Sequence, residues 1–370
     1  MTEWKEYKLG EVAEITSSKR IFYSEYVPNG VPFYRSKEII DLYNKRDVST
    51  ELFISEKRFK EISEKFGAPK EDDILLTSVG SLGIPYKVKP NDRFYFKDGN
   101  LTWFKDIDKE KLLSDYLMYW LSSGVGKQKL EEITIGSTQA AFTISGLKTI
   151  IIEIPSINTQ RQITSILTSL DDKIDLFRRE NATLEAMAET LFRQWFVVEA
   201  KEDWEEGKLG DLIEVKYGKD HKKLSEGIIP VIGSGGVMRY ADKYLYDKES
   251  VLIPRKGSLN NVMYINEPFW TVDTMFYTEM RRPNIAKYVY HFMKGQDLAN
   301  MNVGSAVPSM TTEVLNNIPV DIPPQEVFDR FENAVASLYN KKKQNNKQIQ
   351  TLIQTRDGLL PRLMSGEIKI

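Results

Sequence analysis

The stretch WKEYKLGEVAEI at residues 4–15 returns at residues 204–215 as WEEGKLGDLIEV. Tryptophan, the tripeptide Lys-Leu-Gly, an acidic residue and a later glutamate recur at the same places in both. Further along, ILLTSVGSL at residues 74–82 matches VLIPRKGSL at residues 251–259, and both are apolar runs that lead into a Gly-Ser turn. Because internal self-similarity is the mark of a repeated structural unit, we expect two copies of one fold.

Each copy ends in a segment with the periodicity of a long helix. The copies align without insertion from Thr143 and Thr311 to Leu191 and Leu359. Apolar residues there form the two rows of a heptad pattern, which predicts a coiled-coil seam. In the first copy the rows are Ile163, Leu170, Phe177, Leu184, Leu191 and Leu167, Ile174, Asn181, Ala188, Trp195. A helix of roughly 35 residues is about 50 Å long, so each segment is expected to act as a strut.

The segments before the helices read as globular domains. Residues 1 to about 155 and 204 to about 322 combine short apolar runs, such as 74–76 and 251–253, with helix-like stretches at 115–121 and 286–293. Short apolar runs bounded by turn residues are typical of buried strands. We therefore expect two α/β (α+β) domains, each followed by its own long helix.

Composition excludes several kinds of chemistry. The 370 residues include no cysteine, which excludes disulfides and thiolate metal sites, and the two histidines, His221 and His291, are too far apart for a zinc pair on one helix. We expect no metal site. A net charge of −2 limits any nucleic-acid surface to a local basic patch. The charged N-terminus and the lack of an apolar run of membrane length predict a cytoplasmic protein.

Motifs for catalysis are also missing. The Gly-Ser-Gly-Gly stretch at residues 233–236 has Met238 where a dinucleotide fingerprint needs glycine, so it is interpreted as a turn. No phosphate-binding loop is present, and Pro323-Pro324 lacks the flanking residues of an adenine methyltransferase tetrad. What remains is the polar, basic and aromatic chemistry of the loops. Trp103, Trp120 and Trp270 are interpreted as core residues, because large aromatic side chains dominate protein cores.

Polar and basic loops remain as candidates for binding. Arginine and lysine pair with guanine and phosphate, asparagine and glutamine pair with adenine, and backbone amides of glycine turns approach phosphates. Any one of these loops alone fits an ordinary solvated surface, but matching loops recur in both copies. The candidate DNA-binding residues are Lys19, Arg20, Arg35, Ser36, Lys37, Ser78, Ser81 and Gln139 in the first copy, and Lys216, Tyr217, Lys219, Lys222, Lys223, Ser234, Arg239, Arg255, Lys256, Ser258, Asn260, Asn261 and Ser305 in the second.

The sequence resembles the specificity (S) subunit of type I DNA restriction-modification systems over essentially its whole length. The resemblance rests on Lys-Leu-Gly at residues 8–10 and 208–210, on Ile154-Pro155 followed by Gln160 and Ile163, and on LFRQWF at 191–196. Residues 230–277 also resemble the family's second recognition domain, whereas Pro-Pro-Gln-Glu at 323–326 departs from the usual pattern.

The resemblance implies an architecture. Target recognition domains would span residues 1–157 and 201–324. The long helices, known in the family as the central and C-terminal conserved regions, would span residues 158–200 and 325–370. These helices would pack as an antiparallel coiled coil, giving a pseudo-twofold internal repeat.

The resemblance also implies a function. Each domain would read one half-site of an asymmetric, bipartite sequence in double-stranded DNA, with a spacer set by the helices. The chain would dock two modification (adenine methyltransferase) subunits and, in the full complex, restriction subunits, and Met187, Phe192 and Phe196 are candidates for that interface. S-adenosylmethionine, ATP and Mg would be cofactors of these partners, with none in this chain, and the chain itself would be a non-catalytic subunit. The alternative is a coiled-coil adaptor whose domains bind proteins; an enzyme with two catalytic copies is disfavoured, because the loops differ.

Overall fold

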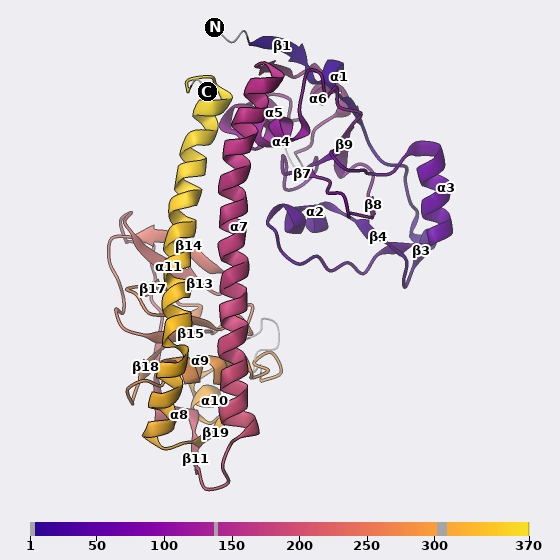
Figure 1. The fold of residues 1–370 in the computed structure, drawn as a ribbon. Helices are drawn as coiled ribbons and strands as arrows, with labels where there is room; N and C mark the ends of the chain where they lie inside the picture. The colour runs from indigo at the N-terminus through magenta and orange to yellow at the C-terminus, as the bar shows by residue number, and fades with distance from the viewer. Residues whose placement is uncertain (1–3, 137–139, 302–308, 369) are drawn as a thin grey trace. The chain divides into compact units, whose positions relative to one another are not determined.

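The computed structural model describes residues 4–136, 140–301, 309–368 and 370. It divides into two compact units, one of Met1–Leu176 with Gln348–Ile370 and the other of Phe177–Lys347 (Figure 1). Two long helices, α7 (Ile157–Arg193) and α11 (Gln325–Met364), contribute to both units. Among the described residues, no helix is long and apolar enough to cross a membrane.

The first unit holds the first copy of the repeat. Its strands are β1 (Lys5–Lys8), β2 (Glu14–Thr16), β3 (Tyr26–Val27), β4 (Val31–Tyr34), β5 (Phe53–Ile54), β6 (Ile74–Thr77), β7 (Pro85–Lys87), β8 (Tyr95–Phe96), β9 (Leu101–Lys105) and β10 (Ile151–Ile154). Its helices are α1 (Leu9–Val12), the 3₁₀ turn η1 (Tyr23–Glu25), α2 (Ser36–Tyr43), α3 (Glu56–Phe66), α4 (Ser114–Ser122), α5 (Gly124–Glu132) and α6 (Ile144–Thr149). The strands form an antiparallel sheet of order β2-β9-β6-β7, a second sheet of order β3-β5-β4-β8, and the pair β1-β10.

Local sequence explains these elements. All four residues of β6 are buried, as expected of an apolar run in the middle of a sheet. Helix α3 begins where the Ser55 side chain accepts a 3.1 Å hydrogen bond from the Arg58 amide. It ends at Gly67, whose φ of 83° lies in the left-handed region that favours glycine.

The second unit holds the second copy. Its strands are β11 (Glu205–Lys208), β12 (Ile213–Tyr217), β13 (Ile229–Gly233), β14 (Gly236–Ala241), β15 (Ser250–Pro254), β16 (Met263–Ile265), β17 (Trp270–Thr271), β18 (Met275–Met280) and β19 (Pro319–Ile322). Its helices are η2 (Gln194–Val198, a π-helical turn), α8 (Leu209–Leu212), α9 (Ala286–Lys294) and α10 (Thr312–Asn316). The sheets have the orders β12-β18-β15-β16, β14-β13-β17 and β11-β19.

The predicted repeat is confirmed by the order of the strands. The sheet β2-β9-β6-β7 of the first copy corresponds to β12-β18-β15-β16 of the second, and the pair β1-β10 corresponds to β11-β19. In the second sheet, the parallel pair β4-β8 corresponds to the parallel pair β13-β17. The first copy adds one further strand, β3, which pairs with β5. Two α/β domains with two long helices are therefore present, as the sequence predicts.

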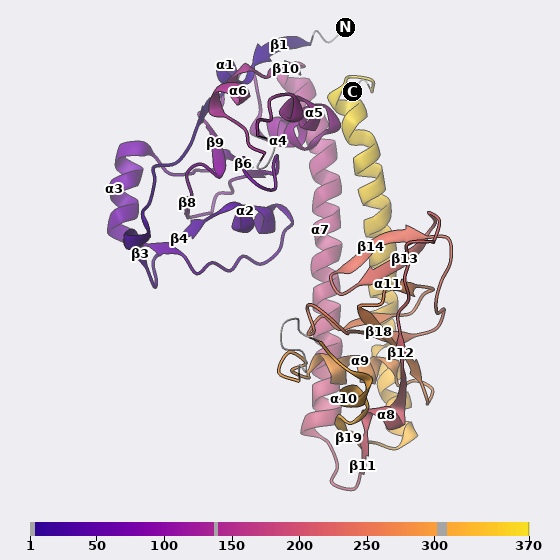
Figure 2. The same ribbon diagram turned by 180° about the vertical axis from the view of Figure 1, so that it is seen from behind.

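The long helices pack together in the antiparallel sense (Figures 1 and 2). In the second unit the Asn181 amide of α7 donates a 2.7 Å hydrogen bond to Asn346 of α11, and Glu185, farther along α7, pairs with Lys342, farther back along α11. The heptad seam is buried or partly buried along both helices, and Asn345 is fully enclosed and bonded to Asn181 at 3.0 Å. Its polar interruption is thus an internal hydrogen-bonded layer, as a buried asparagine in a coiled coil requires.

The end of α7 and the turn η2 that follows it pack against the second domain through aromatic rings. Phe196 lies 5.1 Å from Phe331 and 4.7 Å from Tyr288 between ring centroids, and Phe192 stacks on His291 at 5.5 Å. The His291 Nε2 lies 2.8 Å from the Tyr339 hydroxyl, and the ring is buried. Burial lowers the pKa of His291 to about 4, since no solvent stabilises its charged form.

We predict that this histidine makes the fold sensitive to mild acid. The unfolded chain binds the proton near pH 6.5 but the folded chain near pH 4, so the free energy of unfolding falls as the pH falls between these values. The loss approaches about 3 kcal/mol, because each tenfold difference in proton affinity is worth about 1.4 kcal/mol. Urea unfolding from pH 7 to pH 4 should show a shallower loss for His291→Gln than for the wild type. Equal losses in both proteins would contradict this assignment.

Candidate nucleic-acid interface

Strand direction brings the candidate loops to one edge of each domain. In the first copy β2 and β6 both pair antiparallel with β9, so they run in the same direction and end at the same edge. In the second copy β12 and β15 do the same around β18. The loops after these strands, together with those after β4 and β13, carry most of the candidate residues. We call this edge of each domain the strand-end edge.

In the first copy the strand-end edge contains a cavity. Its volume is about 520 Å³, and its lining comprises Ser36, Lys37, Ile40, Asp41, Arg46, Val79, Gly80, Ser81 and Asn100. Three predicted residues, Ser36, Lys37 and Ser81, are thus brought together. Lys37 and Ser81 are exposed, whereas the Ser36 hydroxyl is buried and makes no hydrogen bond. Arg46, which pairs with Asp41 at 2.7 Å, and Asn100 were missed from the sequence, because they lie in irregular segments without a motif.

Other cations of the first copy have partners within the domain. The Arg20 guanidinium is exposed and pairs with Asp98 at 2.8 Å. The exposed Lys19 ammonium lies 5.2 Å from the centre of the Phe66 ring. Half-buried Arg35 bonds the buried Glu38 carboxylate at 2.8 Å, and this hydrogen bond raises the pKa of Arg35. Arg35 therefore holds the start of α2, and much of its charge is compensated.

Two predicted residues make hydrogen bonds within their own domain. Ser78 is buried, and its hydroxyl bonds Thr102 at 2.7 Å, so it supports β6 and does not face solvent. The Arg239 guanidinium bonds the carbonyl oxygens of His221 and Leu224, tying the loop after β12 to β14. Their residue types suggested free side chains, but Ser78 is buried and the half-buried Arg239 is bonded to backbone carbonyl groups. Gln139 and Ser305 lie outside the described residues.

In the second copy the strand-end edge is built by cross-loop contacts. The Arg255 guanidinium lies 5.4 Å from the centre of the exposed Tyr217 ring and donates a 2.9 Å hydrogen bond to the Asp273 carbonyl. The Asn261 amide donates a 2.7 Å bond to the Ser234 carbonyl, which joins the loops after β15 and β13. A Cβ at Gly257, where φ is 87°, would lie 3.2 Å from the Ser234 hydroxyl, so the turn suits glycine.

The remaining candidates of the second copy differ in whether their side chains are already bonded within the domain or exposed to solvent. Lys216 pairs with Glu214, and the Asn260 side-chain oxygen accepts a 3.0 Å bond from the Ala299 amide. The exposed polar candidates are Lys219, Lys222, Lys223, Lys256, Ser258 and Asn260. Within the described part of the chain, none of these four lysines has an ion-pair partner. They supply uncompensated positive charge at this edge.

Of the three tryptophans predicted to be core residues, two are buried. Trp103 and Trp120 are buried, as expected of core residues. Trp270 is half-buried and donates a 2.9 Å bond to the Lys219 carbonyl, so it supports the basic loop after β12.

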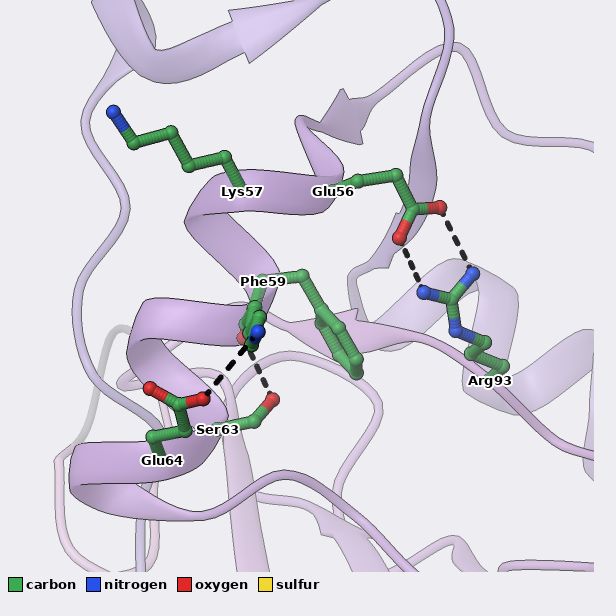
Figure 3. A pocket seen from close by; sticks show the side chains of 7 residues that line it. Glu56, Lys57, Phe59, Ser63, Glu64 and Arg93 are labelled. Carbon is green, nitrogen blue, oxygen red and sulfur yellow. Dashed lines mark hydrogen bonds and ion pairs between the residues drawn. The ribbon is translucent and has the colours of Figure 1, made fainter.

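A larger hollow lies on α3, away from the loops that the sequence singled out. Its volume is about 650 Å³, and Figure 3 shows its lining of Glu56, Lys57, Phe59, Ser63, Glu64 and Arg93, with Lys60. Arg93 forms a two-point ion pair with Glu56, and Lys60 lies 4.0 Å from Glu64. Carboxylates thus compensate most of its cations, which makes it a poor site for phosphate. The described residues contain no cluster of His, Cys, Asp and Glu that could hold a metal ion.

Two copies of an α/β domain with basic strand-end loops, each followed by a long helix, define a duplicated recognition protein. The model of the type I restriction modification DNA specificity domain matches residues 1–186 and 201–354, and the chain belongs to this family. Its role in a restriction enzyme complex is thus DNA target recognition, and the subunit is itself non-catalytic. The family resemblance seen in the sequence is confirmed.

Individual relatives cover the whole chain. The type I restriction enzyme MjaIX specificity subunit of Methanocaldococcus jannaschii is 26% identical over 420 residues, covering 100% of this chain and 94% of that one. The HindI specificity subunit of Haemophilus influenzae is 22% identical, with 100% of both chains covered. The crystal structure of the S subunit from M. genitalium has a TM-score of 0.58 at 19% identity, covering 98% of this chain and 96% of that one. This likeness supports the fold.

We predict that Arg239 contributes to stability and Lys222 does not. Arg239→Ala leaves two carbonyl groups without their donor and should cost about 1–3 kcal/mol in the free energy of unfolding. Lys222→Ala changes an exposed residue of the loop that Arg239 binds, and it should change stability by less than about 0.5 kcal/mol. Chemical denaturation of both variants checks this. A stable Arg239→Ala protein that has lost DNA binding would instead make Arg239 a direct contact.

Proposed function

We propose that each domain reads one half-site of a bipartite, asymmetric DNA target through its strand-end edge. Recognition domains would span residues 1–157 and 201–324, and the helical regions 158–200 and 325–370 would set the spacer between the half-sites. The observation that carries the proposal is the recurrence of the candidate loops at topologically equivalent strand ends in both copies. Because the side chains on these loops differ, the half-sites should differ as well.

The chemistry of the second edge suits both kinds of DNA contact. Flexible, exposed lysines such as Lys222 and Lys223 suit phosphates, which position a protein on the duplex. Arg255 is held on one side by the Tyr217 ring and on another by the Asp273 carbonyl, so its remaining donors have a defined direction. A planar, oriented guanidinium is suited to the two acceptors of guanine in the major groove.

The family assignment also supports a place in a larger assembly. We infer that the helices dock two modification subunits, which would bring S-adenosylmethionine, and that restriction subunits would bring ATP and Mg, all in the cytoplasm. Of the helix residues considered for docking, Met187 is half exposed. Phe192 and Phe196 pack against the second domain and are removed from the candidates.

The proposal is tested by selecting duplexes from a random library with the purified full chain. One split motif with a constant gap is expected. Binding should weaken steeply with salt, by roughly a thousandfold between 50 and 200 mM if six or more phosphates are contacted. Recovery of no motif and binding insensitive to salt would favour the alternative of an adaptor whose domains bind proteins.

Arg255→Ala should impair reading of the second half-site alone. Loss of an oriented base contact should reduce the binding free energy by about 1–3 kcal/mol for duplexes with the matching base. The effect of base changes in the first half-site on affinity should stay the same. Lys248→Ala is the matched control, because this exposed cation lies before β15, at the opposite end of the strand that leads to Arg255. Competition binding with single-base variants gives the answer. A uniform loss across all sequences would show that Arg255 contacts a phosphate.

A further inference from the structure

Two neighbouring aromatic side chains of the first domain are left in solvent. Phe22 is 62% exposed and Tyr23 is 90% exposed, in the segment that joins β2 to β3. Single exposed apolar residues are common in soluble proteins. Two adjacent exposed rings are unfavourable in water, and contiguous exposed apolar surface marks contact sites more often than a single residue does. Neither residue belongs to the candidates that the sequence suggested.

The backbone that carries these rings is rigidly held. Tyr23 begins the 3₁₀ turn η1, in which the Phe22 amide donates a 2.8 Å hydrogen bond to the Glu25 carboxylate. Glu25 in turn pairs with Arg58 of α3 at 2.7 Å. On either side, the buried Ile21 and the ring of Tyr26, which packs on Phe33, anchor the turn in the core. The backbone that carries the rings is therefore already ordered, which lowers the conformational entropy lost when the rings contact a ligand.

The surroundings of the turn suit a nucleic acid. The same segment, part of the strand-end edge, begins with two exposed cations: Lys19, which lies over the Phe66 ring, and Arg20, which pairs with Asp98. The second copy has a comparable arrangement: Tyr217, 53% exposed, ends the equivalent strand β12 and is followed by Lys219 and Lys222. Both copies thus combine an exposed ring with cations after the same strand, although their loop sequences differ.

We infer that Phe22 and Tyr23 stack on DNA bases within the first half-site, with nearby cations on the adjoining phosphates. This inference rests on the proposed function and adds the kind of contact that the first domain makes. Proteins that contact bases in this way combine a basic surface with aromatic platforms, and some insert apolar rings between base steps. A protein partner would not need cations beside the rings.

The test is a double-mutant cycle between ring and base. The full chain and its Tyr23→Ala and Tyr23→Phe variants are titrated with the selected duplex and with duplexes that carry one abasic position at a time. Tyr23→Ala should weaken binding about tenfold or more, and Tyr23→Phe, which keeps the ring, should restore it. At one position of the first half-site, the abasic change should weaken the wild type but not Tyr23→Ala any further.

Two measurements separate stacking from other roles. The salt dependence of Tyr23→Ala binding should equal that of the wild type, because no phosphate contact is lost. Tyr244→Ala removes a ring that is also 53% exposed but lies between β14 and β15, at the other end of that strand, and it should leave affinity unchanged.

The outcomes are distinct. If the wild type selects a split motif and Tyr23→Ala binds it equally well, or loses the same affinity with every abasic duplex, the stacking inference is wrong and the proposed function stands. If Tyr23→Ala keeps its DNA affinity but fails to bind a modification subunit, the rings form a protein contact and the inference is also wrong. If the wild type selects no motif, the proposed function itself fails.

Discussion

Each domain depends on the long helices to complete its hydrophobic core. In the second unit, Ala188 of α7 and Phe331, Val335 and Tyr339 of α11 belong to the same buried cluster as the domain's β15 and α9. In the first unit, Ile163 and Leu167 of α7 and Leu363 of α11 complete the cluster beneath α4. Removing either helix would expose apolar side chains worth about 1.5–3 kcal/mol each. Both helices thus contribute to the cores of both domains.

Antiparallel pairing within this framework explains why the binding loops can vary. In both copies the first and third strands of the main sheet end at the same edge, because a single antiparallel strand lies between them. The edge is a consequence of backbone hydrogen bonding and does not depend on loop sequence. The two copies have therefore kept the same strand order while carrying different polar side chains and even a different number of strands in the second sheet.

The sequence was informative where a pattern repeats and poor where exposure depends on tertiary packing. Heptads such as Ile163, Leu167 and Ile174 predicted the long helices, because burial of one helix face imposes a regular spacing. Ser78 and Arg239 have the residue types of a DNA contact, yet Ser78 is buried against Thr102 and Arg239 is bonded to the carbonyl groups of a neighbouring loop. The exposure of Phe22 and Tyr23 could not be predicted, because the residues around them in the sequence are of the same kinds as those around buried aromatic residues.

The central claim is that both copies meet DNA through equivalent strand-end edges. Hydrogen–deuterium exchange of the full chain, with and without its selected duplex, tests it most directly. The account predicts slower exchange in the segments after β2, β4 and β6 and in those after β12, β13 and β15, with the opposite ends of these strands unaffected. Protection limited to one copy, or located at the opposite strand ends, would contradict it.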